Sequence, residues 1–490
     1  MRTGSFVDGK WFHPTSSARR VRNVNPADTE DVLAEFPSAG AAEVARAIEG
    51  AEKAQREWGR TPGPERGRVL ARAVEIARRR AEEIARTLTR EEGKILKEAR
   101  GEVQKGIAVL EFYAGEGFRL QGRTLPSEIR DVFTCTIRRP LGVVGLITPW
   151  NFPWAIPCWK TAPALVAGNA VIFKPAELTP ATATLLVEVY EEAGLPPGVL
   201  QFLVGPGSEV GNAIVDHPAI KAISFTGSNE VGLKLNERAA KRGVKVTCEM
   251  GGKNAVIVLP DADLDAVVAG VVNGAFGSTG QRCTATSRLL VHEDVAGRVT
   301  EALVDAARKL KVGPGLDETS QMGPAVDEKQ LRTDLSYMEL GRAEGAKLLC
   351  GGGRPKGLER GFFAEPTVFA DVAPGSRLFQ EEVFGPVLGI TRFRTLDEAL
   401  RLANAVQFGL TSSLYTRDFA SALRFMEEIE AGMVHVNEPT VGGEAQLPFG
   451  GVKATGVGER EMSVEGLNFF TETKTVFLNF SGSASRSFIR

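Results

Sequence analysis

The chain has 490 residues, with 43% hydrophobic and 24% charged side chains and a formal net charge of −2. Its length predicts two to four domains around a sizeable core, and its near-neutral charge excludes a molecule drawn as a whole to nucleic acid or to an anionic membrane. Five cysteines at irregular spacing form no CxxC pair, which argues against a disulfide framework and a cysteine metal site.

The N-terminal residues lack the apolar core of a signal peptide, and the longest nearly apolar run, residues 162–173, is too short to cross a membrane. Together with the cysteine pattern, these features predict a cytoplasmic protein whose partners include neither a membrane nor nucleic acid. The basic run at residues 78–80 lies among glutamates in a helix-prone segment, so we interpret it as a solvated face.

The two ends of the chain are β-prone, and a helical region follows the first of them. Residues 1–38 alternate short β-prone pieces with turn formers and predict an outer hairpin. From Ala41 to about Gly117, apolar residues recur at helical spacing among Arg and Glu, so we expect a helical scaffold. Residues 120–139 turn polar and β-prone. The C-terminal residues 471–479 are also β-prone and need a partner edge, which a second subunit could supply.

The middle of the chain alternates short apolar runs with helix-length segments. The expected strands cover residues 143–147, 170–173, 201–204, 222–225 and 245–247, and the clearest helices cover residues 179–193 and 230–241. This alternation predicts an α/β fold with a doubly wound, Rossmann-like parallel sheet, whose ligands bind beyond the carboxyl ends of its strands.

A second α/β region is expected from about residue 252 to residue 450. Its predicted strands cover residues 255–258, 288–291 and 410–415. Its predicted helices cover residues 295–310 and 418–429. Cys283 lies at the front of this region, so it would face the first sheet across an interdomain cleft, a common place for ligand sites.

Cys283 stands in a run of small residues, with no bulky aliphatic side chain between Phe276 and Leu289. Such a thiol can serve as a nucleophile if a base or a lowered pKa provides the thiolate. None of the four histidines lies in a run typical of a catalytic loop, so the best candidate base is Glu249, at a strand end before Gly251. The same patterns also fit an inert core cysteine and an ordinary turn.

Six motifs that occur in order along nearly the whole chain, from about residue 5 to residue 480, carry a family resemblance. They are Pro149-Trp-Asn-Phe-Pro153, Phe173-Lys-Pro-Ala-Glu177, Phe225-Thr-Gly-Ser228, Glu249-Met-Gly-Gly-Lys253, Gly280-Gln-Arg-Cys283 and Glu382-Val-Phe-Gly-Pro386. On these motifs the chain resembles the NAD(P)-dependent aldehyde dehydrogenase superfamily. Over residues 280–288 it is similar to 2-oxoglutarate semialdehyde dehydrogenases, so short ω-semialdehydes head the expected substrates.

The resemblance implies the catalytic roles. Cys283 would attack the aldehyde to form a thiohemiacetal, hydride would pass to the cofactor, and Glu249 would activate the water that hydrolyses the thioester. Asn151 and the backbone N–H of Cys283 would stabilise the oxyanion, although Asn151 also fits a turn between its aromatic neighbours. No metal is expected.

The resemblance also implies a dinucleotide site. Its expected residues are Trp150, Lys174, Glu177, Gly207, Gly211, Thr226, Gly227, Ser228, Gly251, Glu382 and Phe384. Their glycine-bearing turns suit a phosphate at a helix N-terminus but lack the GxGxxG fingerprint. Without the family resemblance, the charged residues Lys174, Glu177 and Glu382 would be interpreted as solvated surface groups. Glu177 would bond the ribose hydroxyls and repel a 2′-phosphate, so we expect NAD; Lys174 leaves NADP possible.

The predicted substrate-binding residues are Arg282, Trp159 and Phe449. Four apolar residues fit either a substrate funnel or the hydrophobic core: Trp154, Ile156, Trp159 and Phe449. Arg282 fits either a guanidinium that holds the second anionic group of a substrate or one that pairs within the protein. Counting forward from the Phe449-Gly-Gly-Val-Lys loop places Arg460 where many relatives have a proton-relay Glu, so no relay is assigned, although Lys160 could line the site.

The resemblance divides the chain into a dinucleotide-binding domain (residues 1–119 and 141–251), a catalytic domain (252–450) and a small β oligomerisation element (120–140 and 468–490). A homodimer or homotetramer is therefore expected. Two alternatives remain: a cysteine hydrolase or thioesterase without nicotinamide, and a coenzyme A-acylating relative, although the latter class usually lacks the base that Glu249 provides.

Overall fold

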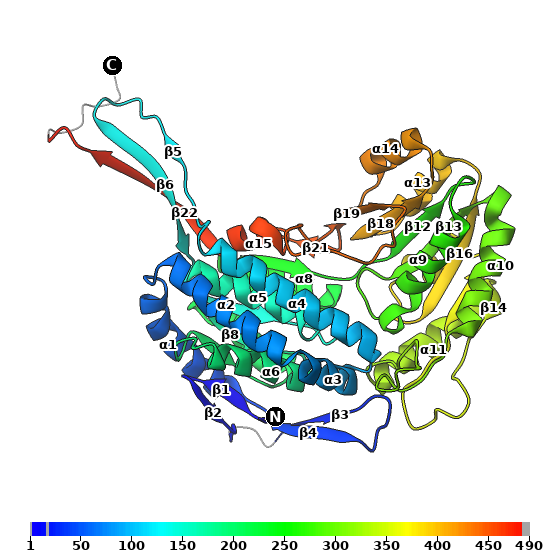
Figure 1. Cartoon of the computed structure of the whole chain (residues 1–490), viewed down its shortest axis with the longest axis horizontal. Coiled ribbons are helices and arrows are strands. Elements are labelled where there is room, and N and C mark those ends of the chain that lie inside the picture. The colour runs from blue at the N-terminus through cyan, green and yellow to red at the C-terminus, as the bar shows by residue number, and fades with distance from the viewer. Residues whose placement is uncertain (1, 16–18, 483–490) are drawn as a thin grey trace.

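The structure is a computed structural model that describes residues 2–15 and 19–482. Two α/β lobes lie side by side, and a narrow β-sheet projects from one of them (Figure 1). Among the described residues, no helix is both long and apolar enough to span a membrane.

The first lobe is built on an eight-stranded sheet with the strand order β2-β1-β9-β8-β7-β10-β11-β21. Its strands are β1 (Ser5–Val7), β2 (Lys10–Phe12), β7 (Val143–Ile147), β8 (Ala170–Lys174), β9 (Leu200–Phe202), β10 (Ile220–Thr226), β11 (Lys245–Glu249) and β21 (Gly456–Val457). The five strands from β9 to β11 are parallel. These are the five apolar runs predicted from the sequence, and they confirm the doubly wound fold.

Helices cover both faces of this sheet. They are α1 (Ala41–Trp58), α2 (Gly63–Arg79), α3 (Ala81–Glu92), α4 (Leu96–Glu116), α5 (Ala155–Ala167), α6 (Pro180–Glu192), α7 (Asn212–Asp216) and α8 (Asn229–Ala240), with one turn of π-helix, η1 (Gly207–Gly211). Helices α2 to α6 contribute to one core and α1, α7 and α8 to the other. Because both faces are covered, β7, β8 and β9 are buried along their whole length.

The second lobe holds a seven-stranded sheet with the strand order β14-β15-β16-β13-β12-β18-β19. Its strands are β12 (Asn254–Val258), β13 (Thr286–His292), β14 (Lys347–Cys350), β15 (Thr367–Ala370), β16 (Val387–Phe393), β18 (Thr411–Tyr415) and β19 (Met433–Val436). Its helices are η2 (Gly277–Gly280), α9 (Leu264–Phe276), α10 (Glu293–Lys309), α11 (Glu328–Ala343), α12 (Arg377–Gln380), α13 (Leu396–Asn404) and α14 (Phe419–Glu428). The neighbouring strands are parallel except for β14 and β15.

The projecting sheet pairs the C-terminal strand within the chain. β22 (Thr471–Asn479) pairs antiparallel with β6 (Val132–Pro140) along its whole length, and β5 (Thr124–Leu125) lies on the far side of β6. One edge of the C-terminal strand is therefore paired by the same chain, and whether a second subunit meets the strand stays a prediction. The outer edge of β22 has no partner among the described strands.

Smaller elements complete the chain. They are the pair β3 (Arg20–Val24) and β4 (Val32–Pro37), the pair β17 (Phe408–Gly409) and β20 (Val452–Lys453), and α15 (Ser463–Phe469). The predicted domain boundaries stay a prediction, and their residues 483–490 lie outside the described part of the chain. Because β21 joins the first sheet, the chain returns to the first lobe after residue 450.

Candidate active site

A cavity of about 410 Å³ carries Cys283 in its wall. Helices α4 and α5 form one side, and the loop before β13 and residues 441–443 form another. Trp159 and Phe449 also line it, with their ring centroids 5.4 Å apart. The nucleophile predicted from the sequence is thus half-buried at a cavity large enough for a small ligand.

The loop that carries Cys283 has a strained but well-held backbone. Ser278 and Thr279 adopt left-handed conformations with φ of 49° and 59°. The backbone N–H of Ser278 donates to Glu98 Oε1 at 2.7 Å, and the Thr279 hydroxyl donates to the carbonyl of Gly323 at 3.0 Å. Because such conformations persist only where surrounding contacts impose them, these bonds fix the path of the chain into Cys283.

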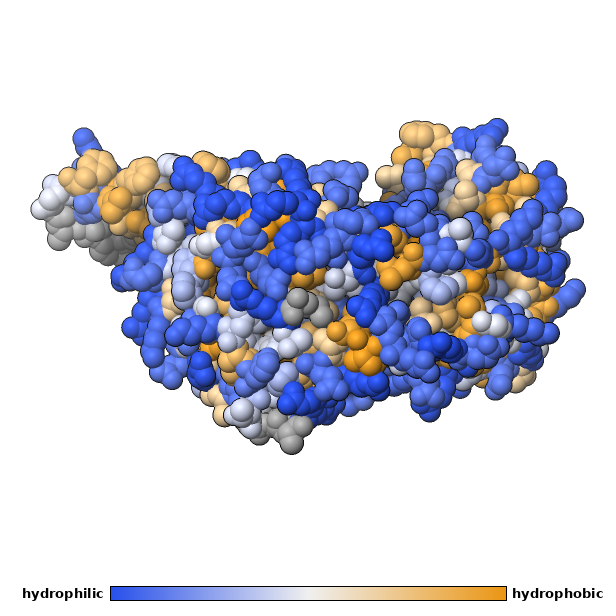
Figure 2. Space-filling view, turned by 60° about the horizontal axis from the view of Figure 1, so that its bottom comes forward, coloured by the Kyte–Doolittle hydropathy of each residue, from blue (hydrophilic) through white to orange (hydrophobic). Residues whose placement is uncertain are grey.

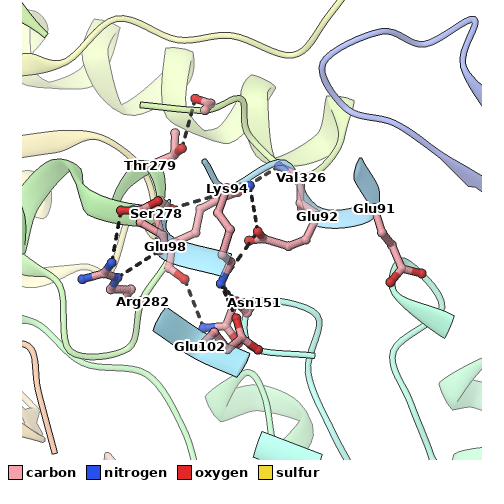
Figure 3. A network of polar contacts seen from close by, with 12 residues as sticks. Glu91, Glu92, Lys94, Glu98, Glu102, Asn151, Ser278, Thr279, Arg282 and Val326 are labelled. Carbon is pink, nitrogen blue, oxygen red and sulfur yellow. Dashed lines mark hydrogen bonds and ion pairs between the residues drawn. The ribbon is translucent and has the colours of Figure 1, made fainter. Parts of the chain in front are cut away.

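Asn151 lies next to this loop. Its side chain is 4% exposed, and Nδ2 donates to the carbonyl of Gln281 at 3.1 Å. The carbonyl of Asn151 accepts a 2.7 Å bond from the ammonium of Lys94 (Figure 3). The amide predicted to stabilise an oxyanion is therefore anchored beside the nucleophile from both of its ends.

Behind Asn151 lies a buried ion pair that the sequence reasoning missed. Lys94 donates to Glu102 Oε2 at 2.7 Å, and both side chains are buried (Figure 3). Glu102 Oε1 accepts from the backbone N–H groups of Trp154 and Ala155, at 2.9 and 3.1 Å, where α5 begins. Since all these groups are paired, the network ties α4 to the strand-to-helix turn that carries Asn151.

The thiol of Cys283 is not activated by its surroundings. Burial raises its pKa, and the nearby charges of Glu382 and Glu249 raise it further. The group is therefore a neutral thiol at neutral pH, and it needs a base or an added positive charge to become a thiolate.

Glu249 ends β11 and is 4% exposed. Among the described residues, its Oε2 has no hydrogen-bond partner. Burial holds its pKa well above 4.5, and the charge of Glu461 adds to that shift, while Lys160 and Arg460 oppose it. Gly450, with φ of 143°, leaves room for this carboxyl, because a Cβ there would lie 2.4 Å from Glu249 Oε1.

The acid that lies buried beside Lys160 is Glu461, one position after Arg460. Glu461 Oε1 accepts from the ammonium of Lys160 and, at 2.9 Å, from the hydroxyl of Ser224. Its Oε2 accepts from Trp159 Nε1 at 2.8 Å. Arg460 instead donates to the carbonyl of Gly451. Counting residues from the glycine loop missed this acid by one position.

The two glycines after Glu249 bring the lobes together. The N–H of Gly252 donates to Glu382 Oε1 at 2.7 Å, and a Cβ on Gly252 would lie 2.4 Å from the carbonyl oxygen of Cys283. A Cβ on Gly251 would lie 2.2 Å from Glu382 Oε2. Burial raises the pKa of Glu382 to about 7. The end of β11 with Glu249, the loop that carries Cys283 and the side chain of Glu382 therefore meet within this short stretch.

The other predicted cofactor residues lie mainly at the carboxyl ends of β7, β8 and β10. Trp150 packs edge-on against Phe384, at 5.4 Å between ring centroids. Lys174 is buried, and burial lowers its pKa to about 8. Glu177 pairs at the surface with Arg19, at 2.9 Å. The acid that was expected to meet a ribose thus already has a cation beside it.

The turn after β10 offers polar groups that the protein does not use. The hydroxyl of Thr226 is buried and has no partner among the described residues. Ser228 precedes α8 without capping it through its side chain. A Cβ on Gly207 would meet no atom within 4 Å, which leaves open space at the turn after β9. These features fit a dinucleotide, whose phosphates bind backbone and hydroxyl donors at such turns.

Some of the predicted substrate residues line the cavity, and others lie in the hydrophobic core. Ile156 lines the cavity, as Trp159 and Phe449 do. Trp154 is fully buried, donates to the carbonyl of Val103 and belongs to the core. Arg282 lines the cavity but also pairs with Glu98 at 3.3 Å.

Comparison with known proteins agrees with this geometry. The sequence model of the aldehyde dehydrogenase family matches residues 11–476. The chain is 44% identical over 476 residues to the alpha-ketoglutaric semialdehyde dehydrogenase of Bacillus subtilis (97% of each chain) and 45% identical over 480 residues to the 2,5-dioxopentanoate dehydrogenase of Saccharolobus solfataricus (97% and 99%). It superposes with a TM-score of 0.95 on Staphylococcus aureus betaine aldehyde dehydrogenase in complex with NAD+, at 33% identity (99% and 96%). These matches confirm the resemblance carried by the six motifs.

Proposed function

The chain belongs to the aldehyde dehydrogenase family, and we propose that it oxidises a short-chain semialdehyde to its carboxylic acid with NAD. The observation that carries this proposal is the position of Cys283 in the cavity wall, next to the Gln281 carbonyl that Asn151 binds, with Glu249 near enough for its charge to raise the pKa of the thiol. The names of the two relatives at 44% and 45% identity favour the semialdehyde of a five-carbon 2-oxo acid as the substrate.

Cys283 is the nucleophile of the proposed reaction. The thiol first loses its proton to water, which the positive charge that NAD+ would supply when bound favours, and its Sγ then adds to the aldehyde carbon to form the anion of a thiohemiacetal. The oxygen that becomes negative is then stabilised by the Asn151 amide, which Lys94 and Gln281 hold in place. Bound NAD would accept the hydride from the same carbon, which leaves a thioester on Cys283.

Glu249 is the general base of the second half-reaction. A carboxyl with a raised pKa is well matched to take a proton from water near neutral pH. The activated water hydrolyses the thioester, releases the acid and returns the thiol. Lys160 and Glu461 lie buried near Glu249 and influence its charge, which supports a proton relay through them.

NAD is favoured as the cofactor over NADP. The NAD+ complex of the structural neighbour supports it, and so do the unused donors after β10 and the carboxylate of Glu177. Glu177 would have to share its charge between Arg19 and the ribose hydroxyls. In a hydrolase or thioesterase these groups would have no role, and the buried base opposes coenzyme A acylation.

We also propose a cytoplasmic homodimer or homotetramer. All five cysteines are free, as suits a reducing compartment. The projecting sheet carries apolar residues on its surface (Figure 2, upper left). They are Leu125, Phe133, Phe477, Leu478 and Phe480, all exposed. Together with the outer edge of β22, which no other strand within the described part of the chain pairs, they support contact with a second copy.

The test is an absorbance screen for NADH with semialdehydes and apolar aldehydes, run in parallel with NAD and NADP. We expect NADH formation with NAD, fastest with a semialdehyde of a 2-oxo acid, and none for Cys283→Ala. Ester hydrolysis without any nicotinamide-dependent aldehyde oxidation would refute the proposal in favour of a hydrolase.

A further inference from the structure

The cavity beside Cys283 contains a cation without a counter-ion. Lys105 on α4 lines this cavity, and its ammonium donates to the carbonyl of Gly443 in the opposite wall. Among the described residues, no carboxylate lies within ion-pair distance of Lys105, which is half-buried. A cation in such a place keeps the cost of its lost hydration without the gain of an ion pair.

The other charged residues of the cavity wall are already neutralised. Arg282 pairs with Glu98 at 3.3 Å and also donates to the hydroxyl of Ser278 at 3.1 Å. Glu102 pairs with the buried Lys94 at 2.7 Å. The wall contains no charged residue beyond Glu98, Glu102, Lys105 and Arg282 within the described chain. Among the described residues the cavity wall therefore presents one positive charge without an ion-pair partner, that of Lys105.

Resting on the proposed function, we infer that Lys105 binds the distal carboxylate of the semialdehyde, and that Arg282 does not. In this arrangement the substrate supplies the missing counter-ion while its aldehyde reaches Cys283 in the same cavity. Arg282 and Glu98 act as a brace for the nucleophile loop, because Glu98 also holds the backbone of Ser278. The specificity for an acidic aldehyde thus comes from α4.

The electrostatics of Lys105 agree with this role. Burial lowers its pKa to about 8, and the charge of Glu444 opposes that shift only in part. A carboxylate in the cavity would favour the charged ammonium and remove part of the cost of burying it. An uncharged aldehyde would bring no such gain, so the contact distinguishes between the two substrate classes.

The experiment compares succinic semialdehyde with butanal, which has the same number of carbons but no carboxylate. In Lys105→Met we expect KM for succinic semialdehyde to rise about 10- to 100-fold, as for the loss of one charge-assisted contact. KM for butanal should change by less than about threefold. Lys105→Arg should restore most of the selectivity. The matched control is Lys97→Met, an exposed lysine on the same helix, which should change neither KM.

The variant Arg282→Met distinguishes the role of Arg282 from that of Lys105. If Arg282 braces the loop, its loss lowers kcat for both aldehydes alike; if it binds the carboxylate, its loss raises KM for succinic semialdehyde alone, and the inference is wrong. Equal effects of Lys105→Met on both substrates would also overturn it. Failure of the proposed function would look different, because the unaltered protein would then produce no NADH from any aldehyde.

Discussion

Replacing Glu249 by Gln should stop the reaction after its first half. The substitution keeps the shape of the side chain but removes the base, while Cys283 and Asn151 are unchanged. Hydride transfer to NAD should therefore proceed once in each active site, and the thioester should accumulate. Loss of a general base lowers a rate by about 10²- to 10⁴-fold, so steady turnover should fall by that factor after a burst of one NADH per active site.

The same substitution should stabilise the fold, and the gain should depend on pH. The pKa of Glu249 is raised in the folded protein, so the folded state keeps a proton that the unfolded chain releases above pH 4.5. Stability is therefore lost as pH rises from 4.5 towards the folded-state pKa, by about 1.4 kcal/mol per pH unit. Gln has no such proton, so its advantage over Glu249 should grow with pH.

Two measurements check this reasoning. Rapid mixing with aldehyde and NAD, followed at the NADH absorbance band, should give a burst and then a nearly flat line for Glu249→Gln. Thermal unfolding at pH 5 and pH 8 should show a larger stabilisation of the variant at pH 8. A linear trace at the unaltered rate would remove Glu249 from the mechanism. A stabilisation that shrinks with rising pH would contradict the raised pKa.

Three further substitutions probe the rest of the site. Cys283→Ala should abolish NADH formation but still bind NAD, as measured by calorimetry; any residual aldehyde-dependent NADH would contradict its role. Glu461→Gln removes a charge that raises the pKa of Glu249, so the acidic limb of the pH–rate profile should move to lower pH, and a shift to higher pH would be inconsistent with that coupling. Lys94→Met leaves Glu102 buried without its partner, so we expect a loss of about 3–5 kcal/mol, seen as a large fall in melting temperature; an unchanged midpoint would mean that the pair does not stabilise the fold.

The buried parallel strands could be predicted because their sequence reports their environment directly. Strands covered on both faces consist of continuous apolar residues, and residues 143–147 and 170–173 have this character. Each is followed by a turn at the same edge of the sheet, so the amino-acid pattern by itself places Asn151 and Lys174 on the ligand side. Local pattern was sufficient for both conclusions.

The partner of the C-terminal strand could not be predicted in this way. Its β-prone residues 471–479 show that a strand forms but not which edge it meets. The pairing of Thr471 with Pro140 joins positions more than 300 residues apart, and no local signal specifies it. The sequence therefore could not show that β6 of the same chain pairs with this strand.

The buried acid Glu461 was missed because counting assumes a regular loop. Phe449 and Glu461 form an isolated β-bridge, and Met462 and Ser463 then adopt left-handed conformations with φ of 59° and 49°. The backbone direction at this bend determines which of three successive polar residues points into the protein. Sequence shows only that Arg460 has an acid on each side.

The buried charges of Lys94, which lies between α3 and α4, and of Glu102 on α4 were missed for a different reason. Lys94 and Glu102 lie in a helical region rich in charged residues, where charge normally marks the solvated face. They are buried because each has its partner in the folded protein, eight residues away along the chain. A single sequence gives the charges but not the pairing that makes burial possible.

The hydrogen bonds of the two buried acids explain why Glu249, rather than Glu461, is the acid that can accept a proton directly from a water. Glu461 accepts bonds from Lys160, Ser224 and Trp159, so its oxygens are occupied and its charge is matched. Glu249 has an oxygen without a partner among the described residues, and burial favours its neutral form. The donors around two acids in one buried region thus distinguish them: Glu461 is held by three donors, whereas Glu249 keeps an oxygen that can meet a water.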